Sequence, residues 1–163
     1  MDQLSIIQSK IILDWSDLES VLAIWKFKNQ KVVFTNGCFD IIHLGHVEYL
    51  AKAAAHGNQL VIGLNSDASV KRLKGPSRPV QDENTRAMVL ASFSFVSKVV
   101  LFDEDTPFEL IKLILPDILV KGSDYEPDKI IGYDIVTANG GEVITIDLVN
   151  GHSTTGIINK ICN

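Results

Sequence analysis

Short runs of aliphatic and β-branched residues alternate along the chain with polar loops and with stretches rich in helix formers. A continuous apolar run of this kind is typical of a strand that is buried on both faces. The pattern predicts five strands, at residues 31–35, 59–65, 98–102, 118–121 and 142–146. Because helical stretches separate them, the sequence predicts an α/β fold with a Rossmann-like, doubly wound parallel sheet of about five strands.

Helices are expected between these strands, where helix formers and apolar spacings of three or four occur. One helix begins near His43 and ends at Gly57, a residue type favoured just after a helix. Another is opened by Thr106 and Pro107 and ended by Pro116. Further helices are expected at residues 82–93, at residues 127–139 and from Thr154 or Thr155 onward, and residues 66–80 are expected to form a long loop.

The first 30 residues precede the first predicted strand. Ser16 and Glu19 have the spacing of a capping box, and apolar residues then follow with helical periodicity. We therefore expect one domain over residues 1–163, with a helical extension at residues 1–30 and a core that carries the chemistry at residues 31–163.

Composition narrows the function classes. Hydrophobic residues make up 46% of the chain and the net charge is −5, so no general basic field is available for nucleic acid. No signal peptide and no apolar run of transmembrane length is present, so we expect a cytoplasmic protein with no membrane partner. The two cysteines predict no disulfide framework. The glycine patterns of dinucleotide-binding and P-loop proteins are both absent, which argues against those classes.

The residues that follow the first predicted strand carry the strongest chemical signal. His43, Gly45 and His46 fall in the first turn of the predicted helix, and the two histidines, three apart, share one face of that turn. A helix N-terminus has free N–H groups and the positive end of the helix dipole, so it attracts phosphate. A surface histidine beside a capping histidine is the alternative interpretation.

Polar groups also follow the other predicted strands, whose carboxyl ends should meet at one edge of the sheet. Three of the four groups have a structural alternative: turn capping after the second strand, a solvated basic loop, or simple capping of the last helix. The groups are Asn65 and Asp67; Lys71, Arg72, Lys74, Arg78 and Arg86; residues 121–125; and Ser153, Thr154 and Thr155.

The string Thr35-Asn36-Gly37-Cys38-Phe39-Asp40, followed by His43-Leu44-Gly45-His46, resembles the signature of the HxGH nucleotidylyltransferase superfamily. Within it, the chain is similar to the adenylyltransferases that act on D-glycero-β-D-manno-heptose 1-phosphate, which occur alone or as the C-terminal half of a kinase fusion. The resemblance extends from about residue 30 onward.

The resemblance implies an enzyme that joins ATP and a sugar 1-phosphate and releases pyrophosphate, with Mg²⁺ accompanying ATP. It implies His43, His46 and Lys74 as catalytic residues, and we expect a homodimer or higher homo-oligomer. The implied nucleotide-binding residues are Thr35, Asn36, Gly37, Phe39, His43, Gly45, His46, Arg86, Lys121, Gly122, Asp124, Ser153, Thr154 and Thr155. The implied substrate-binding residues are Asp40, Asn65, Asp67, Lys74 and Tyr125, with Asp40, Asp67 and Asp124 as candidates for sugar or ribose hydroxyls.

One departure from the superfamily pattern bears on the nucleotide. Cytidylyltransferases carry Arg-Thr-Glu-Gly before the last hydroxyl cluster, whereas this chain has Leu148-Val149-Asn150-Gly151. The difference favours ATP over CTP. A cytidylyltransferase acting on glycerol 3-phosphate or a related phosphate remains an alternative, and so does a nucleotide-binding regulatory module without catalysis.

Overall fold

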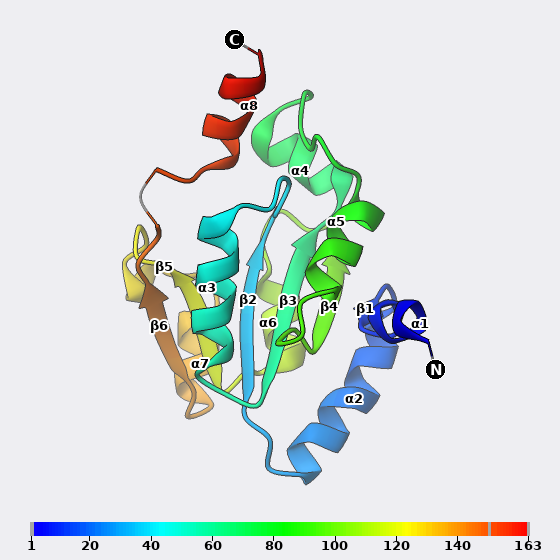
Figure 1. Cartoon of the computed structure of the whole chain (residues 1–163). Helices are drawn as coiled ribbons and strands as arrows, with labels where there is room; N and C mark the ends of the chain where they lie inside the picture. Colours follow the sequence, from blue (N-terminus) through cyan, green and yellow to red (C-terminus); the bar gives the residue numbers. More distant parts are fainter. Residues whose placement is uncertain (1, 150, 163) are drawn as a thin grey trace.

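The computed structural model describes residues 2–149 and 151–162 (Figure 1). Its centre is a parallel sheet with the strand order β1-β4-β3-β2-β5-β6. The five predicted strands are confirmed, and a sixth is present in the N-terminal segment. The strands are β1 (Ile11–Ile12), β2 (Val32–Gly37), β3 (Gln59–Asn65), β4 (Lys98–Phe102), β5 (Ile118–Gly122) and β6 (Glu142–Ile146).

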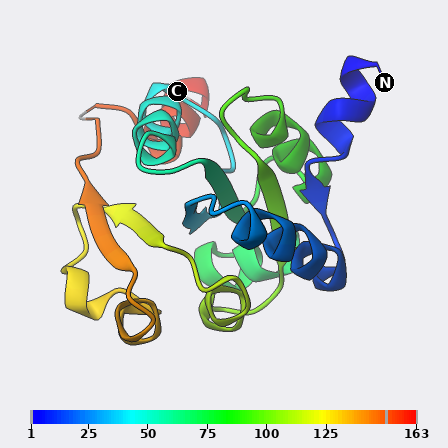
Figure 2. The ribbon, with the colours of Figure 1, turned by 90° about the horizontal axis from the view of Figure 1, so that it is seen from below.

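Helices cover both faces of the sheet (Figures 1 and 2). One apolar cluster joins α3 and α5 to one face, and a second cluster joins α2, α6 and α7 to the other. The helices are α1 (Gln3–Gln8), α2 (Trp15–Phe27), α3 (Leu44–Ala54), α4 (Asp67–Lys74), α5 (Glu83–Ala91), α6 (Phe108–Ile114), α7 (Tyr133–Ala138) and α8 (Thr154–Cys162), with a 3₁₀ turn η1 (Pro127–Lys129) before α7.

The sheet has its topological switch point between β2 and β5. From β2 the chain proceeds through β3 to β4 on one side, whereas β5 and β6 lie on the other side. β2 pairs with β3 along its whole length but with β5 only at Val33 and Phe34. The carboxyl ends of β2 and β5 therefore separate, and a crevice of this type is where ligands bind in open α/β sheets.

The N-terminal segment differs from the expected helical extension. Ile11 and Ile12 pair with Val99 and Val100 of β4, so this segment supplies an edge strand as well as helices. The expected capping box at Ser16 and Glu19 is wrong. Asp14 caps α2 instead, because its carboxylate accepts a hydrogen bond from the Ser16 N–H at 3.0 Å.

Two further expectations need correction. Most of the expected loop at residues 66–80 forms α4, whose start is capped by Ser66 and which ends at Gly75 with a φ of +96°. The expected helix at residues 127–139 is split into η1 and α7 by Gly132, whose φ is +93°. A side chain at Gly132 would be strained in this conformation and would also lie 2.9 Å from Ile111.

One predicted helix end also shifts. α3 ends at Ala54 with Ala55 as its C-cap, not at Gly57. Gly57 is instead placed where a Cβ atom would lie 2.8 Å from the Lys31 carbonyl oxygen. No helix in the described part of the chain has the length and apolar character that crossing a bilayer requires.

Candidate active site

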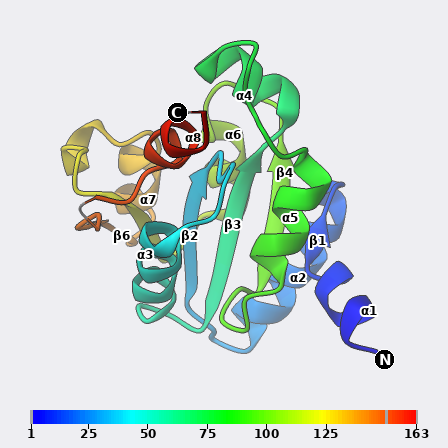
Figure 3. The same ribbon diagram turned by 45° about the horizontal axis from the view of Figure 1, so that its top comes forward.

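A cavity of about 690 Å³ opens at the carboxyl edge of the sheet, at the switch point. Its walls come from the ends of β2, β3 and β5, the start of α3, the end of α4 and the start of α8. Figure 3 shows α3, α4 and α8 gathered around this edge. Of the residues implied by the resemblance, the cavity is lined by Asn36, Gly37, Phe39, Asp40, His43, Gly45, His46, Asn65, Lys74, Lys121, Gly122, Asp124, Tyr125, Ser153, Thr154 and Thr155.

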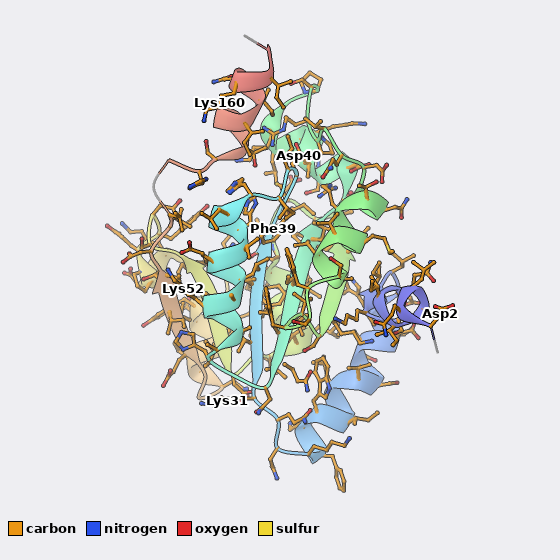
Figure 4. All side chains as sticks on the ribbon, in the orientation of Figure 1. Asp2, Lys31, Phe39, Asp40, Lys52 and Lys160 are labelled. Atoms are coloured by element: carbon orange, nitrogen blue, oxygen red, sulfur yellow. The ribbon has the colours of Figure 1, made fainter. Side chains whose placement is uncertain are left out.

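The signature loop, residues 38–43, joins β2 to α3 and begins with a tight turn. Phe39 has a left-handed φ of +44°, and its ring folds back so that a Cβ atom on Gly37 would lie 3.0 Å from it. The Phe39 ring is buried and meets the His46 ring edge-on at 5.3 Å. Phe39 therefore packs against His46, and Figure 4 labels Phe39 and Asp40 at the upper end of the central strands.

The two histidines of the motif are stacked on each other at the start of α3. Their ring centroids are 3.9 Å apart and their planes differ by 23°. The Nδ1 atoms of His43 and His46 are buried and have no hydrogen-bond partner among the described residues. Each ring therefore has Nε2 as the nitrogen that can reach a ligand in the cavity.

Both imidazoles are neutral at pH 7. Burial lowers the pKa of His46 to about 4, with a smaller contribution from His43, and the Ile41 carbonyl opposes the shift. Burial also lowers the pKa of His43, and the nearby His152 lowers it further. Neutral histidines at this position can donate one hydrogen bond each without repelling one another.

The starts of α3 and α8 lie side by side. A Cβ atom on Gly45 would make an ordinary contact of 3.5 Å with Cβ of His152, which places the two segments next to each other, but it would crowd the His43 ring at 3.1 Å. Ser153 Oγ accepts the Gly156 N–H at 3.0 Å and caps α8, as expected of a capping hydroxyl. Two helix N-termini thus face one part of the cavity, and each favours negative charge.

Asp40 holds the loop before α5 against the signature loop. Its buried carboxylate accepts hydrogen bonds from Arg78 Nε at 2.6 Å, from the Val80 N–H at 2.8 Å and from the Gln81 N–H at 2.9 Å. Burial alone would raise the pKa of Asp40, but these backbone N–H groups and the Arg78 guanidinium outweigh it and lower the pKa. Both carboxylate oxygens of Asp40 therefore already accept hydrogen bonds from the protein. The expected contact between Asp40 and sugar hydroxyls would have to compete with these bonds.

Arg86 and Asp67 are not among the residues that line the cavity, and their expected roles as phosphate and sugar ligands stay predictions. Arg86 is fully buried, with Nη1 donating to the carbonyl oxygens of Cys38 at 2.6 Å and Asn65 at 2.9 Å. Its Nε donates to the Gln81 carbonyl, and Nη2 donates to Asp67 Oδ1 at 2.7 Å. Arg86 therefore links the ends of β2 and β3 to the start of α5.

Thr35, whose expected role in nucleotide binding stays a prediction, also lies behind the wall of the cavity. It is fully buried within β2, and its hydroxyl shares a 2.8 Å hydrogen bond with the Tyr49 hydroxyl. Burial raises the pKa of Tyr49 to about 12, so this pair stays uncharged. Thr35 lies outside the cavity wall, whereas Tyr49 lines it.

Two lysines bring positive charge into the cavity from opposite sides. Lys74 is exposed at the end of α4 and has no ion-pair partner in the described part of the chain, whereas Arg72 on the same helix pairs with Asp105 at 2.7 Å. Lys121 lies at the end of β5, with Nζ 5.7 Å from the centroid of the Tyr125 ring. Burial lowers the pKa of Lys121 to about 8, although Asp124 acts in the opposite direction.

Several lining residues were outside the set implied by the resemblance. Most are apolar or lie far from any motif, so sequence spacing carries no signal for them. The exceptions are Cys38, which lies within the signature string, Arg78, which belongs to the basic group already singled out, and His152, which precedes the last hydroxyl cluster. Burial raises the pKa of the Cys38 thiol, which makes it an inert wall residue. The additional lining residues are Cys38, Tyr49, Leu73, Arg78, Asp105, Pro107, Lys129, Ile130, Ile131, Leu148, Val149 and His152.

Comparison with known proteins identifies the family. Residues 34–159 match the family model described as cytidylyltransferase-like. The chain is 57% identical over 144 residues to the bifunctional protein HldE of Azorhizobium caulinodans and 57% identical over 153 residues to that of Syntrophotalea carbinolica. These matches cover 88% and 94% of this chain but only 30% and 31% of the relatives, so the chain spans about a third of their length.

Two solved structures resemble the fold. The lipopolysaccharide core biosynthesis protein from Thermoplasma volcanium is 27% identical, with a TM-score of 0.62 over 74% of this chain and 99% of that one. Pantoate-β-alanine ligase from Francisella tularensis is 14% identical, with a TM-score of 0.61 over 93% of this chain and 77% of that one, and it shows the fold alone. The expectation drawn from the HxGH motif is confirmed: the chain belongs to the cytidylyltransferase-like family of nucleotidyltransferases.

Proposed function

We propose that the chain is an adenylyltransferase that transfers AMP from ATP to D-glycero-β-D-manno-heptose 1-phosphate. The products are ADP-heptose and pyrophosphate, for use in lipopolysaccharide core synthesis. The observation that carries the proposal is the stacked, neutral pair His43 and His46 at the start of α3, beside the start of α8. The relatives named HldE and the structural neighbour named for lipopolysaccharide core biosynthesis support the choice of sugar.

The proposed reaction is a single in-line displacement. An oxygen of the sugar 1-phosphate forms a bond to the α-phosphorus of ATP, the bond from that phosphorus to the oxygen bridging to the β-phosphate breaks, and pyrophosphate leaves with the electron pair. The nucleophile is already an anion, so no general base and no covalent enzyme intermediate is required. Catalysis then consists of positioning and of stabilising the charge that develops on the phosphoryl oxygens.

The cavity supplies donors for this charge. Nε2–H of His43 and of His46 would donate to the α-phosphate and to the bridging oxygen, which leaves the buried Nδ1 atoms as unprotonated acceptors. Lys74 and the N–H and hydroxyl groups of Ser153, Thr154 and Thr155 would hold the β- and γ-phosphates. The buried Asn36 Oδ1, which has no partner among the described residues, would accept a hydroxyl of the bound nucleotide.

Mg²⁺ would enter with ATP. In the described part of the chain, no group of three or more His, Cys, Asp or Glu side chains is arranged to hold a metal ion. The Asp40 carboxylate is saturated and that of Asp105 is paired with Arg72. The ion would therefore be held mainly by triphosphate oxygens and water, as is common for Mg²⁺, and would offset the triphosphate charge. The expected homodimer or higher homo-oligomer remains a prediction.

The base preference rests on the wall after β6. Leu148 and Val149 line the cavity where cytidylyltransferases would carry the Arg-Thr-Glu-Gly residues, so the wall there is apolar and carries no arginine. We expect this wall to accept adenine better than cytosine.

A coupled pyrophosphate-release assay tests the proposal, with ATP and CTP each paired with heptose 1-phosphate and with glycerol 3-phosphate. We expect the largest kcat/KM for ATP with heptose 1-phosphate. An equal or larger value for CTP would assign the chain to the cytidylyltransferases that its family description names. Release with none of the four pairs would favour a nucleotide-binding module without catalysis.

A further inference from the structure

The cavity has two sides, and Lys121 is on the side away from the histidines. Side chains alternate along a strand, so Lys121 shares a face with Leu119. Leu119 packs in the cluster that contains Leu110 and Ile111 of α6, whereas α3, which carries His46, packs on the opposite face. Lys121 therefore enters the cavity from the α6 side of the switch point.

The Lys121 ammonium forms no ion pair among the described residues, although Asp124 is near enough to act on its pKa. No carboxylate lies within ion-pair distance of Nζ in residues 2–149 and 151–162, and the contact at 5.7 Å is to the face of the Tyr125 ring. A largely desolvated cation without a partner is unfavourable. By contrast, Lys129 on the rim of the same cavity is exposed and paired with Glu126. The unpaired Lys121 ammonium is therefore explained best by an anionic ligand that binds in the cavity and pairs with it.

The proposed transfer brings two anions together, the triphosphate of ATP and the phosphate of the acceptor. The groups on the histidine side of the cavity account for binding of the triphosphate only. The starts of α3 and α8, together with Lys74, face the part of the cavity assigned to the triphosphate. The acceptor phosphate has to reach the α-phosphorus from the opposite direction, because attack and departure are in line. It also has to overcome the repulsion between two phosphates.

We infer that Lys121 binds the phosphate group of the acceptor and brings it to the α-phosphate of the nucleotide. This inference rests on the proposed function and reassigns Lys121, which the resemblance implied to be a nucleotide ligand. Such a lysine favours an acceptor that carries a phosphate monoester over a neutral acceptor with a free hydroxyl. Asp124 and Tyr125 are exposed beside Lys121 and provide an acceptor and a donor for the hydroxyls of a sugar or polyol.

If Lys121 binds the acceptor phosphate, the affinity for that phosphate should depend on pH through the charge of Lys121. With a pKa of about 8 in the free protein, Lys121 loses half its charge near pH 8, and a bound phosphate dianion raises that pKa. The titratable and charged groups around it are Asp124, Tyr125 and Lys129 on the segment after β5 and Cys38 on the signature loop. Cys38 remains a thiol through this range because burial raises its pKa.

The test is calorimetric titration of the full chain with two probes, heptose 1-phosphate and a non-hydrolysable ATP analogue. Lys121→Met keeps the length of the side chain and removes its charge, and Lys121→Arg keeps the charge at all pH values used. Lys112→Met, on the exposed surface of α6 outside the cavity, is the matched control.

We expect Lys121→Met to weaken binding of the sugar phosphate about 10- to 100-fold and to leave binding of the ATP analogue within about twofold. The affinity of the unmodified protein for the sugar phosphate should fall as pH rises from 8 to 9.5, whereas that of Lys121→Arg should not. Equal weakening of both probes, an unchanged affinity for the sugar phosphate, or no binding of the sugar phosphate to the unmodified protein would each overturn the inference. Pyrophosphate release by the unmodified protein tests the proposed function separately, since Lys121 can hold the sugar phosphate whether or not transfer follows.

Discussion

Arg86 Nη2 donates to Asp67 Oδ1 at 2.7 Å, yet the two partners differ sharply in burial, because the Arg86 side chain is fully buried whereas that of Asp67 is 30% exposed. A buried charge that loses its partners is strongly destabilising. The same guanidinium also holds the carbonyl oxygens of Cys38 and Asn65, each at the end of a central strand. Arg86 is thus a positioning residue for two walls of the cavity.

We expect Arg86→Lys to lower the free energy of unfolding by about 3–5 kcal/mol, since one ammonium cannot replace the several directed hydrogen bonds of the guanidinium. Urea denaturation measures this loss. Asp67→Asn should cost less, because it keeps an oxygen acceptor and its side chain is partly solvated. Arg86→Lys with the stability of the unmodified protein would contradict the assignment.

His43→Ala and His46→Ala should each lower kcat about 10²- to 10³-fold, with a much smaller rise in the KM for ATP. The reason is that donors aimed at charge growing in the transition state help it more than the bound substrate. His46→Ala also removes a packing contact with Phe39, so His46→Gln serves as the variant that retains bulk. If both histidines can be replaced without loss of kcat in folded protein, the stacked pair has no catalytic role.

The lowered pKa of His46 predicts acid-sensitive folding. The unfolded chain takes up a proton near the ordinary histidine value of 6.5, whereas the folded protein does so only near 4. The unfolded state therefore binds more protons between these values, and the stability contributed by neutral His46 is present above pH 6.5 and lost as pH falls toward 4. Chemical denaturation at pH 7 and pH 5 should show a smaller difference for His46→Gln than for the unmodified protein. An identical difference would show that His46 is not the group responsible.

Lys74→Ala should weaken binding of the ATP analogue by about 1.5–3 kcal/mol, the range for a charge-assisted contact. Its effect on stability should be small, because Lys74 is exposed at the end of α4. Lys71→Ala is the matched control: Lys71 is exposed on the same helix but does not line the cavity. Equal effects of the two substitutions on nucleotide affinity would mean that α4 contributes only its general charge.

Sequence periodicity predicted the sheet well because each central strand is a continuous apolar run, and β3, β4 and β6 have the predicted bounds. It missed β1, since two residues are too few to show a period. It also missed α4, whose polar sequence buries only Ser69 and Val70 and so has little apolar periodicity. The break at Gly132 depends on a backbone conformation that no local pattern of polarity reveals.

The sequence predicted those parts of the candidate site that the HxGH motif itself supplies. His43, Gly45 and His46 line the cavity as the helix-start argument required. Arg86 was not, because its burial depends on oxygens from segments up to 48 residues away in the chain. A charged residue in a sequence gives no sign that its partners come from separate strands, and the same holds for the hydrogen bonds that occupy Asp40.

The two-residue strand β1 covers the edge of the sheet that β4 would otherwise expose. It pairs with Val99 and Val100, which are fully buried. Lys10 donates a hydrogen bond to the Phe93 carbonyl oxygen, and Lys98 of β4 donates one to the carbonyl oxygen of Ser9 just before β1. Without it, the Val-rich strand β4 would present a row of free N–H and C=O groups, a template for pairing with another chain. We therefore expect this short N-terminal segment, which does not line the cavity, to protect the protein from aggregation through β4. Its removal should reduce solubility more than catalytic activity.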